Sequence, residues 1–213
     1  MNVTKPNPPE PPPTFRGADD RNTALGVPRT KGTGLLAVRD FALERYPEAW
    51  GQTVAVLSTQ SAALLEGGIL PNGWYPLESY VELVEQLSRL APAADEAVAR
   101  ELGAWEVQRD FRGGIYRALL ALTTPTMAIR VSGALWGMYH RSGKLRAHAS
   151  GPNSARVEVT NFGARSTLFW AYVCGFTQEL ARMANARDAE CVCIEGGSDD
   201  DRFMLADVVW AED

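Results

Sequence analysis

The sequence predicts an α+β fold in which an N-terminal helical bundle packs with an antiparallel sheet of about four strands. Two changes in the hydrophobic pattern carry this prediction. Apolar residues recur at helical spacing from about residue 35 to 139, and then alternate with a period of two. A further long helical stretch then separates the first pair of expected strands from a second pair near the C-terminus. Helices grouped before and between hairpins are typical of α+β domains.

The first 28 residues differ in composition from the rest of the chain. Six of the first thirteen residues are proline, and apolar side chains are sparse. Such a segment cannot bury enough apolar surface to offset its ordering entropy, so we predict a disordered, partly polyproline tail over 1–28. The tail would act as a tether or, alternatively, as a ligand for an aromatic groove. Residues 29–213 are expected to form a single domain.

Prolines and hydroxyl residues mark the ends of the expected helices. Pro47 ends the first helix, because the residue before a proline is pushed out of the helical region. Pro76 suits a first helical turn, where its missing N–H would have no partner, and Thr124 is a good N-cap. The expected helices cover about 31–46, 48–57, 59–65, 77–90, 94–111, 115–122 and 124–139.

Two hairpins and one long helix are expected after residue 143. Strands over 145–149 and 156–160 are joined by a Gly-Pro-Asn turn. Ser166 caps a helix with a continuous apolar stripe, which must lie across one sheet face to be buried. Two final strands are expected over 190–194 and 203–210.

Charge and composition exclude several classes of partner. The net charge is −5 and the pI is near 5.2, whereas binding to nucleic acid or to anionic membranes needs a surplus of Lys and Arg. No apolar run reaches about 18 residues, so no membrane span is expected. The N-terminus lacks the apolar core of a signal peptide, and three cysteines suit a reducing compartment. We therefore predict a cytoplasmic protein.

The sequence offers no convincing catalytic residues. It contains two histidines. His140 follows an expected helix, where it is best placed to cap the C-terminus and interact with the negative end of the helix dipole. His148 lies in an expected strand, where an exposed position is the usual outcome. No Ser-His-Asp or Cys-His arrangement can be inferred, so we predict that the protein is not an enzyme and assign no catalytic residue.

Metal and phosphate sites are also not expected. Cys191 and Cys193 share one face of a strand, but a structural zinc ion needs four ligands. Cys174 lies on the apolar side of its helix, where a free cysteine packs as a small hydrophobe. The three consecutive aspartates at 199–201 lack the spacing of a calcium loop, and Gly-Thr-Gly at 32–34 is too short to hold a phosphate.

An aromatic corner at residues 67–80 is the most distinctive local feature. Glycines and prolines surround Trp74 and Tyr75, and the chain then enters a helix that contains Tyr80. Either the corner is a structural clasp whose rings fold onto the bundle, or it is a surface for a ligand or partner. The candidate ligand- or partner-binding residues are Trp74, Tyr75 and Tyr80, with Trp136 and Tyr139 as weaker candidates.

Six sequence segments between residues 31 and 139 resemble one family. They are Lys-Gly-x-Gly-Leu-Leu at 31–36, Tyr-Pro-Glu-Ala-Trp at 46–50, Ile-Leu-Pro at 69–71, Trp-Tyr-Pro-Leu-Glu-Ser-Tyr at 74–80, Gly-Ile-Tyr-Arg at 114–117 and Leu-Trp-Gly-Met-Tyr at 135–139. In this order they resemble the uncharacterised DUF2378 proteins, a paralogous family best represented in myxobacteria. The resemblance covers about residues 29 to 210.

That family is distantly similar to heme nitric-oxide-binding domains and to vinyl-reductase-like ligand-binding domains. The similarity implies an α+β fold and a sensory or regulatory role, with a small ligand in an apolar pocket or a protein partner. The heme proteins use a proximal histidine and a Tyr-x-Ser-x-Arg signature, which this chain lacks. We therefore predict no cofactor, heme included. The vinyl-reductase-like cysteine pattern keeps only Cys193 and a following glycine, which argues against a redox or metal role there.

Two main functional hypotheses follow. The first is a non-catalytic cytoplasmic signalling or adaptor domain that acts through a protein or small-ligand partner. The alternative is a small-molecule sensor with an enclosed apolar pocket for a lipid-like or aromatic metabolite, and an enzyme of unknown type ranks third. The sequence leaves open the oligomeric state and the identity of the ligand or partner.

Overall fold

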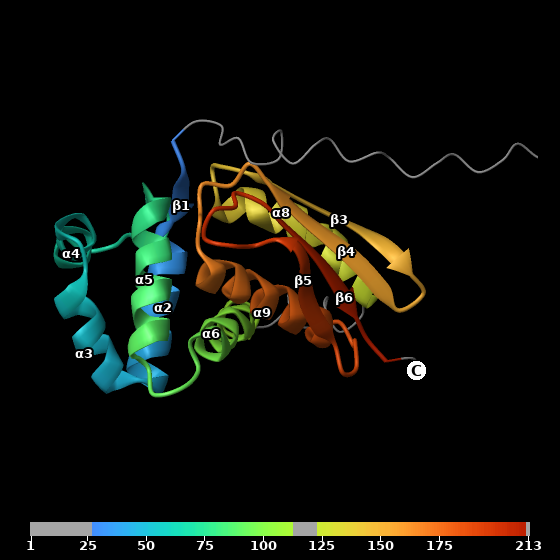
Figure 1. The fold of residues 1–213 in the computed structure, drawn as a ribbon, viewed down its shortest axis with the longest axis horizontal. Coiled ribbons are helices and arrows are strands. Elements are labelled where there is room, and N and C mark those ends of the chain that lie inside the picture. Colours follow the sequence, from blue (N-terminus) through green and yellow to red (C-terminus); the bar gives the residue numbers. More distant parts are fainter. Residues whose placement is uncertain (1–26, 113–122, 212–213) are drawn as a thin grey trace, which may run out of the picture.

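A layer of helices packs on one face of a four-stranded sheet, with further helices at one end (Figure 1). The computed structural model describes residues 27–112 and 123–211. Within these residues the structure contains seven helices and six strands, which confirms the predicted α+β class. Residues 1–26 of the predicted tail and the apolar stretch at 115–122 lie outside the described residues.

The helices begin and end close to the predicted positions. They are α2 (Gly32–Arg45), α3 (Pro47–Val56), α4 (Thr59–Glu66), α5 (Leu77–Leu90), α6 (Asp95–Asp110), α8 (Pro125–Tyr139) and α9 (Thr167–Met183). Thr124 and Ser166 cap α8 and α9, since each hydroxyl accepts a hydrogen bond from the backbone N–H three residues later.

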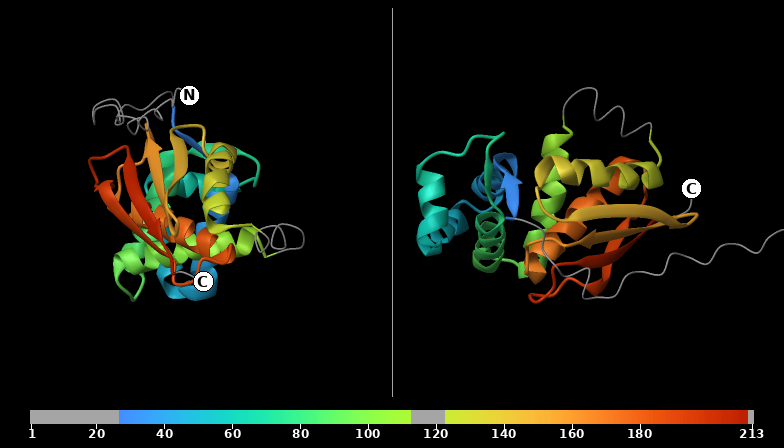
Figure 2. Two further views of the ribbon diagram at one scale, coloured as in Figure 1. Left: turned by 90° about the vertical axis from the view of Figure 1, so that its right-hand side faces the viewer. Right: turned by 90° about the horizontal axis from the view of Figure 1, so that it is seen from above.

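The main sheet is antiparallel throughout. It contains β3 (Lys144–Gly151), β4 (Ser154–Thr160), β5 (Glu190–Gly196) and β6 (Met204–Val209), in the order β3-β4-β6-β5. Helix α8 packs mainly against β3, and α9 packs against β5 and β6. Both helices lie on the same side of the sheet (Figure 2). The long helix between the hairpins therefore covers one sheet face, as its apolar stripe predicts.

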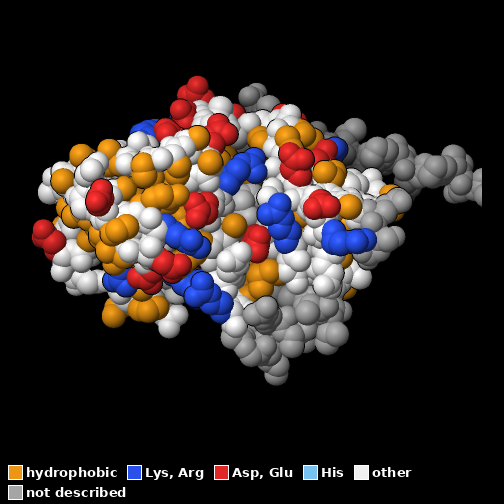
Figure 3. Space-filling model, turned by 90° about the horizontal axis from the view of Figure 1, so that it is seen from below, with side chains coloured by type: hydrophobic (Ala, Val, Ile, Leu, Met, Phe, Trp, Pro, Cys, Tyr) orange, Lys and Arg blue, Asp and Glu red, His pale blue; other side chains and the backbone are white. Residues whose placement is uncertain are grey.

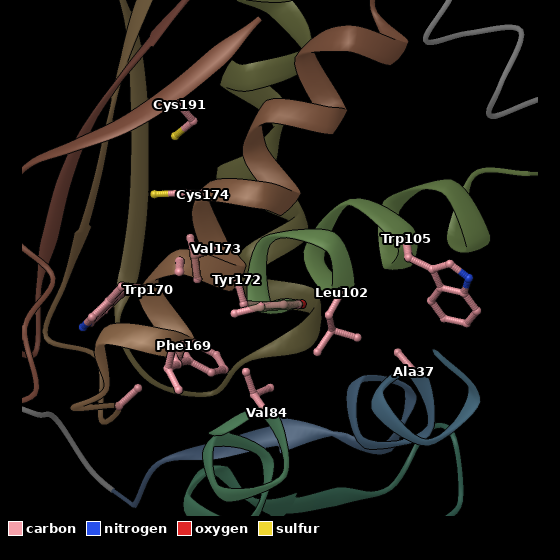
Figure 4. Close-up of a cluster of buried hydrophobic side chains, with 14 of the residues drawn as sticks. Ala37, Val84, Leu102, Trp105, Phe169, Trp170, Tyr172, Val173, Cys174 and Cys191 are labelled. Atoms are coloured by element: carbon pink, nitrogen blue, oxygen red, sulfur yellow. The ribbon is translucent and has the colours of Figure 1, made fainter. Parts of the chain in front are cut away.

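Helix α9 forms the centre of the hydrophobic core. Its side chains Phe169 and Trp170 are almost completely buried, and Figure 4 shows them between the sheet and the other helices. Helix α6 lies directly against α9, and glycines permit this close approach. A Cβ atom on Gly103 would lie 2.7 Å from the backbone nitrogen of Phe176, and one on Gly175 would lie 2.6 Å from the Cα of Arg100.

The aromatic corner contains a short strand that the sequence did not reveal. Strand β2 (Trp74–Pro76) pairs antiparallel with β1 (Arg29–Lys31), with Thr30 opposite Tyr75. The Tyr75 hydroxyl accepts a hydrogen bond of 2.8 Å from the Leu70 backbone nitrogen, closing the turn on itself. Three-residue strands are too short to leave a detectable alternation in the sequence.

Strand β1 also joins the corner to the end of α8. The Arg141 backbone nitrogen donates to the Arg29 carbonyl at 2.9 Å, and Thr30 forms an isolated bridge with His140. The N-terminal corner and the end of α8 are thus connected through the backbone.

The surface carries apolar side chains over the helical end of the molecule. Seen from below, orange side chains gather over the end built from α2 to α5, while charged groups of both signs lie beside them (Figure 3). Leu43, Val54 and Val56 are exposed apolar residues in these helices. Among the described residues, no helix is both long enough and apolar enough to cross a membrane.

Candidate ligand-binding site

A cavity of about 40 Å³ lies where α5, α6, α8 and α9 meet. Five aromatic residues line it together with aliphatic and hydroxyl side chains, one carboxyl and one imidazole. The lining residues are Thr30, Gly34, Tyr80, Glu106, Ser132, Leu135, Trp136, Tyr139, His140, Leu145, Tyr172, Val173, Phe176 and Thr177. A water molecule needs roughly 10–15 Å³ of such space, so the cavity has room for about three water-sized groups.

Glu106 is the polar centre of this cavity. The residue is 2% exposed, and its Oε2 accepts hydrogen bonds from the hydroxyls of Tyr80 (3.1 Å) and Tyr172 (2.8 Å). Burial, reinforced by the nearby charge of Asp110, raises the pKa of Glu106 to about 8. The carboxyl is therefore mostly protonated at neutral pH.

An ion pair and a phenol lie beside Glu106 at the edge of the cavity. The Arg109 guanidinium binds the Asp110 carboxylate at 2.9 Å, and the Tyr139 hydroxyl donates to the same carboxylate at 2.9 Å. Arg109 also lies 3.7 Å from Asp40. Burial and the charge of Asp110 raise the pKa of Tyr139, so this phenol remains neutral.

His140 occupies an aromatic cluster at the other end of the cavity. Its ring centroid lies 4.4 Å from that of Trp136 and 5.0 Å from that of Phe162. The residue is partly exposed, but its Nδ1 is buried and has no hydrogen-bond partner. Burial lowers the pKa of His140 to about 3, so the imidazole is neutral at physiological pH. His140 is the C-cap residue of α8, as predicted, and its backbone N–H donates to the Trp136 carbonyl at 2.8 Å. Because the imidazole is neutral, its side chain adds no positive charge to the end of the helix dipole.

We expect His140 to make the protein less stable in acid. An unfolded histidine takes up a proton near its ordinary pKa of 6.5, whereas the folded one does so only near 3. The unfolded state thus binds more protons in this window, and the free energy of unfolding falls as pH decreases from 6.5 towards 3. In urea unfolding at pH 4, 5, 6 and 7, His140→Phe should lose this contribution. The exposed His148→Gln should retain it, and equal pH dependence in wild type and His140→Phe would contradict the assignment.

The structure brings three of the five predicted ligand-binding residues to this cavity. Tyr80, Trp136 and Tyr139 line it, although they come from two different helices. Trp74 and Tyr75 lie instead in β2, and the Trp74 ring packs 4.2 Å from the Arg141 guanidinium carbon.

Sequence reasoning missed Glu106 and Tyr172. Tyr172 lies in the apolar stripe of α9, where an aromatic side chain indicates core packing and does not mark a binding site. One signal could have identified Glu106, because it lies four residues after Leu102 and thus on the apolar face of α6. A carboxyl on a buried stripe is seldom fully buried without a partner.

The cysteines and the aspartate loop form no metal site among the described residues. Cys174 and Cys191 are buried, and Figure 4 shows their sulfur atoms facing each other between α9 and β5. Asp199 accepts a hydrogen bond of 2.7 Å from the Thr167 backbone nitrogen. This loop, which lacks the spacing of a calcium loop, therefore contacts the first residue of α9.

Known proteins resemble this chain in structure only. No protein family and no curated protein matches it in sequence, so membership of DUF2378 stays a prediction. An Fe(II) unliganded H-NOX protein from K. algicida matches with a TM-score of 0.65 at 14% identity, over 86% of this chain and 97% of that chain. A mutant T. Tengcongensis H-NOX gives 0.61 at 11% identity, over 85% and 98%. The chain has the H-NOX fold.

The H-NOX neighbours overturn the prediction that no cofactor belongs to this kind of chain. Two further neighbours, each with a TM-score of 0.58 and 11 or 12% identity, are proteins in which heme distortion was studied. The prediction rested on the missing Tyr-x-Ser-x-Arg signature and on the placement of the two histidines, but heme was studied in proteins of the same fold that share 11 or 12% identity with this chain.

The cavity offers one feature suited to heme and one that is not. Of the two histidines, only His140 lines the cavity, and its unpartnered Nδ1 belongs to a neutral imidazole. However, about 40 Å³ is far below the roughly 300–1,000 Å³ of clefts that hold drug-sized ligands. With the side chains in these positions, a porphyrin does not fit.

Proposed function

We propose that this protein is a non-catalytic sensor domain that binds a small ligand in the cavity between α6, α8 and α9. The observation that carries the proposal is a cavity in which Glu106 and His140 converge within a wall of aromatic, aliphatic and hydroxyl side chains. Ligand sites typically combine an apolar wall with a few polar groups that orient the ligand. The H-NOX fold adds support, because its solved examples are described by whether a ligand is bound, as in an Fe(II) unliganded protein, or by their heme.

These observations favour the sensor over the adaptor among the sequence-based hypotheses. An adaptor would use the aromatic corner as an exposed docking surface. In the structure Trp74 and Tyr75 belong to a paired strand, and the corner is bonded to α2 through Gly32 and Thr33. The polar groups that could orient a ligand converge in the cavity instead. The resemblance to the DUF2378 family is compatible with either role.

A change in the cavity could reach the rest of the protein through β1. The Thr30 hydroxyl donates to the Tyr139 carbonyl at 3.3 Å, and β1 is paired with β2 on its other side. A ligand that displaces Tyr139 or His140 would therefore disturb the corner. In this proposal the aromatic corner transmits ligand occupancy and does not bind the ligand.

Ligand-induced stabilisation tests the proposal. We expect at least one of two probes of matching size, 2-propanol and isopropylammonium chloride, to raise the melting temperature of the full chain. A probe present at about 100 times its Kd stabilises the folded state by about 2.7 kcal/mol. Scanning calorimetry gives the melting temperature.

Two variants that fill the cavity provide the control. Thr177→Leu and Ser132→Val add apolar volume from α9 and α8, and each original hydroxyl bonds only to a carbonyl of its own helix. Both variants should fold, as judged by circular dichroism, and should lose the ligand-induced shift. A shift of equal size in wild type and both variants, or no shift with any probe, would overturn the proposal.

A further inference from the structure

Glu106 has no cationic partner of its own. The one guanidinium beside it, Arg109, is already bound to Asp110 at 2.9 Å and lies 3.7 Å from Asp40. Among the described residues, Glu106 forms no ion pair. Two carboxyl groups, Glu106 and Asp110, thus lie beside the partly buried Arg109. Asp40 is more exposed and also pairs with Arg39 at 2.8 Å. The site therefore carries an excess of negative charge once Glu106 ionises.

One oxygen of Glu106 is free to bind a ligand. Both phenols donate to Oε2, so Oε1 has no hydrogen bond to any described residue. Glu106 lines the cavity, and the buried polar atoms that lack a partner do not include Oε1. Oε1 therefore borders the cavity space, where a donor group could reach it.

The remaining wall suits a cation with small apolar substituents. Tyr80, Trp136, Tyr139, Tyr172 and Phe176 surround the space. Aromatic faces attract alkylammonium groups, most strongly where water is excluded. The space for about three water-sized groups limits the ligand to roughly three to five heavy atoms.

We propose that the cavity recognises a small organic ammonium ion, whose N–H group binds Oε1 of Glu106 and whose alkyl groups pack against the aromatic wall. This assignment rests on the proposed sensor function and names the chemical class of the ligand. The specificity determinant is the carboxyl, because the aromatic wall by itself would also accept neutral molecules of the same size.

Binding of the cation should displace a proton from Glu106. The groups that face Glu106 are Tyr80, Tyr172 and Tyr139, all neutral because burial raises the pKa of each phenol, together with Arg109 and Asp110. With a pKa of about 8, Glu106 carries roughly 0.9 proton at pH 7, and the cation binds the ionised form. The displaced proton passes to the buffer. Affinity should rise about tenfold from pH 6 to pH 7 and level off above pH 8.

Two probes of equal shape test this assignment on the full chain. Isopropylammonium chloride and 2-propanol have the same number of heavy atoms and differ in charge. In isothermal titration calorimetry at pH 7, isopropylammonium should bind wild type and release roughly 0.9 proton to the buffer. The measured binding heat should therefore differ between phosphate and Tris, because the two buffers take up a proton with different heats. Glu106→Gln keeps an oxygen acceptor for both phenols, and should weaken this binding roughly ten- to hundredfold, the range for hydrogen bonds to charged groups.

The outcomes separate the two proposals. Glu96→Gln, an exposed substitution on the same helix, should leave the affinity unchanged. If 2-propanol binds as tightly as isopropylammonium, and Glu106→Gln binds both like wild type, the ammonium class is wrong but the sensor cavity stands. If isopropylammonium fails to bind while 2-propanol stabilises wild type and not Thr177→Leu, the ammonium class is again wrong and the sensor cavity stands. If neither probe binds, both proposals fail.

Discussion

Replacing Gly103 with alanine is expected to lower the free energy of unfolding by about 3 kcal/mol, at the upper end of the usual cost of overpacking. The added Cβ would collide with the Tyr172 carbonyl oxygen and lie 2.7 Å from the Phe176 nitrogen, both of which are backbone atoms of α9. Backbone atoms in a helix cannot rotate away, so α6 and α9 would have to separate. Gly175→Ala meets the backbone of Arg100 from the opposite side and should cost a similar amount.

A second glycine substitution serves as the matched control. Gly137 lies within α8, and a Cβ there would meet nothing within 4 Å. Gly137→Ala should therefore stabilise the protein by about 0.5–1 kcal/mol, the gain from replacing glycine in a helix. Urea unfolding of all three variants measures these differences. Similar small effects in Gly103→Ala and Gly137→Ala would show that α6 and α9 are not in direct backbone contact.

The second large effect is a loss of stability caused by Glu106 as pH rises. The folded pKa is about 8, above the ordinary value of 4.5, so between these values the folded state retains a proton that the unfolded state has lost. The stability that Glu106 confers is fully present below pH 4.5 and is lost as pH rises to 8. Each pH unit corresponds to about 1.4 kcal/mol, and the whole window to about 5 kcal/mol.

The comparison with Glu106→Gln isolates this effect. His140 acts in the opposite direction below pH 6.5, so the wild-type curve alone would show the slope clearly only between about pH 6.5 and 8. The difference in unfolding free energy between wild type and Glu106→Gln removes the histidine contribution. As pH rises from 4.5 to 8, we expect the free energy of unfolding of wild type to fall relative to that of Glu106→Gln. A difference that stays constant with pH would mean that Glu106 is not buried in its protonated form.

The sequence predicted the elements well because their signals are local. Thr124, Pro76 and Ser166 act on the backbone within one helical turn, and the helices at 77–90 and 125–139 begin where these residues place them. The sheet followed from the change to a period of two. The pairing of β1 with β2 was missed, because its hydrogen bonds join residues about 45 positions apart and neither strand exceeds three residues.

The candidate site was harder to predict because its parts converge only in three dimensions. Three helices contribute its hydrogen-bonded groups. Glu106 bonds to Tyr80, which lies 26 residues away in the sequence, and to Tyr172, which lies 66 residues away. No local pattern connects them. The distant similarity to heme nitric-oxide-binding domains was predicted from the sequence, and H-NOX structures at sequence identities of 9–15% support it. The prediction of no cofactor, drawn from a missing sequence signature, was wrong.

The most direct test follows the carboxyl carbon of Glu106 by ¹³C NMR during a pH titration, with and without isopropylammonium chloride. Because Glu106 is buried and protonated, it should titrate near pH 8 without the compound and at a clearly lower pH with it. A midpoint near the ordinary value of 4.5, unchanged by isopropylammonium, would contradict the assignment of Glu106 as the polar centre of a ligand-binding cavity.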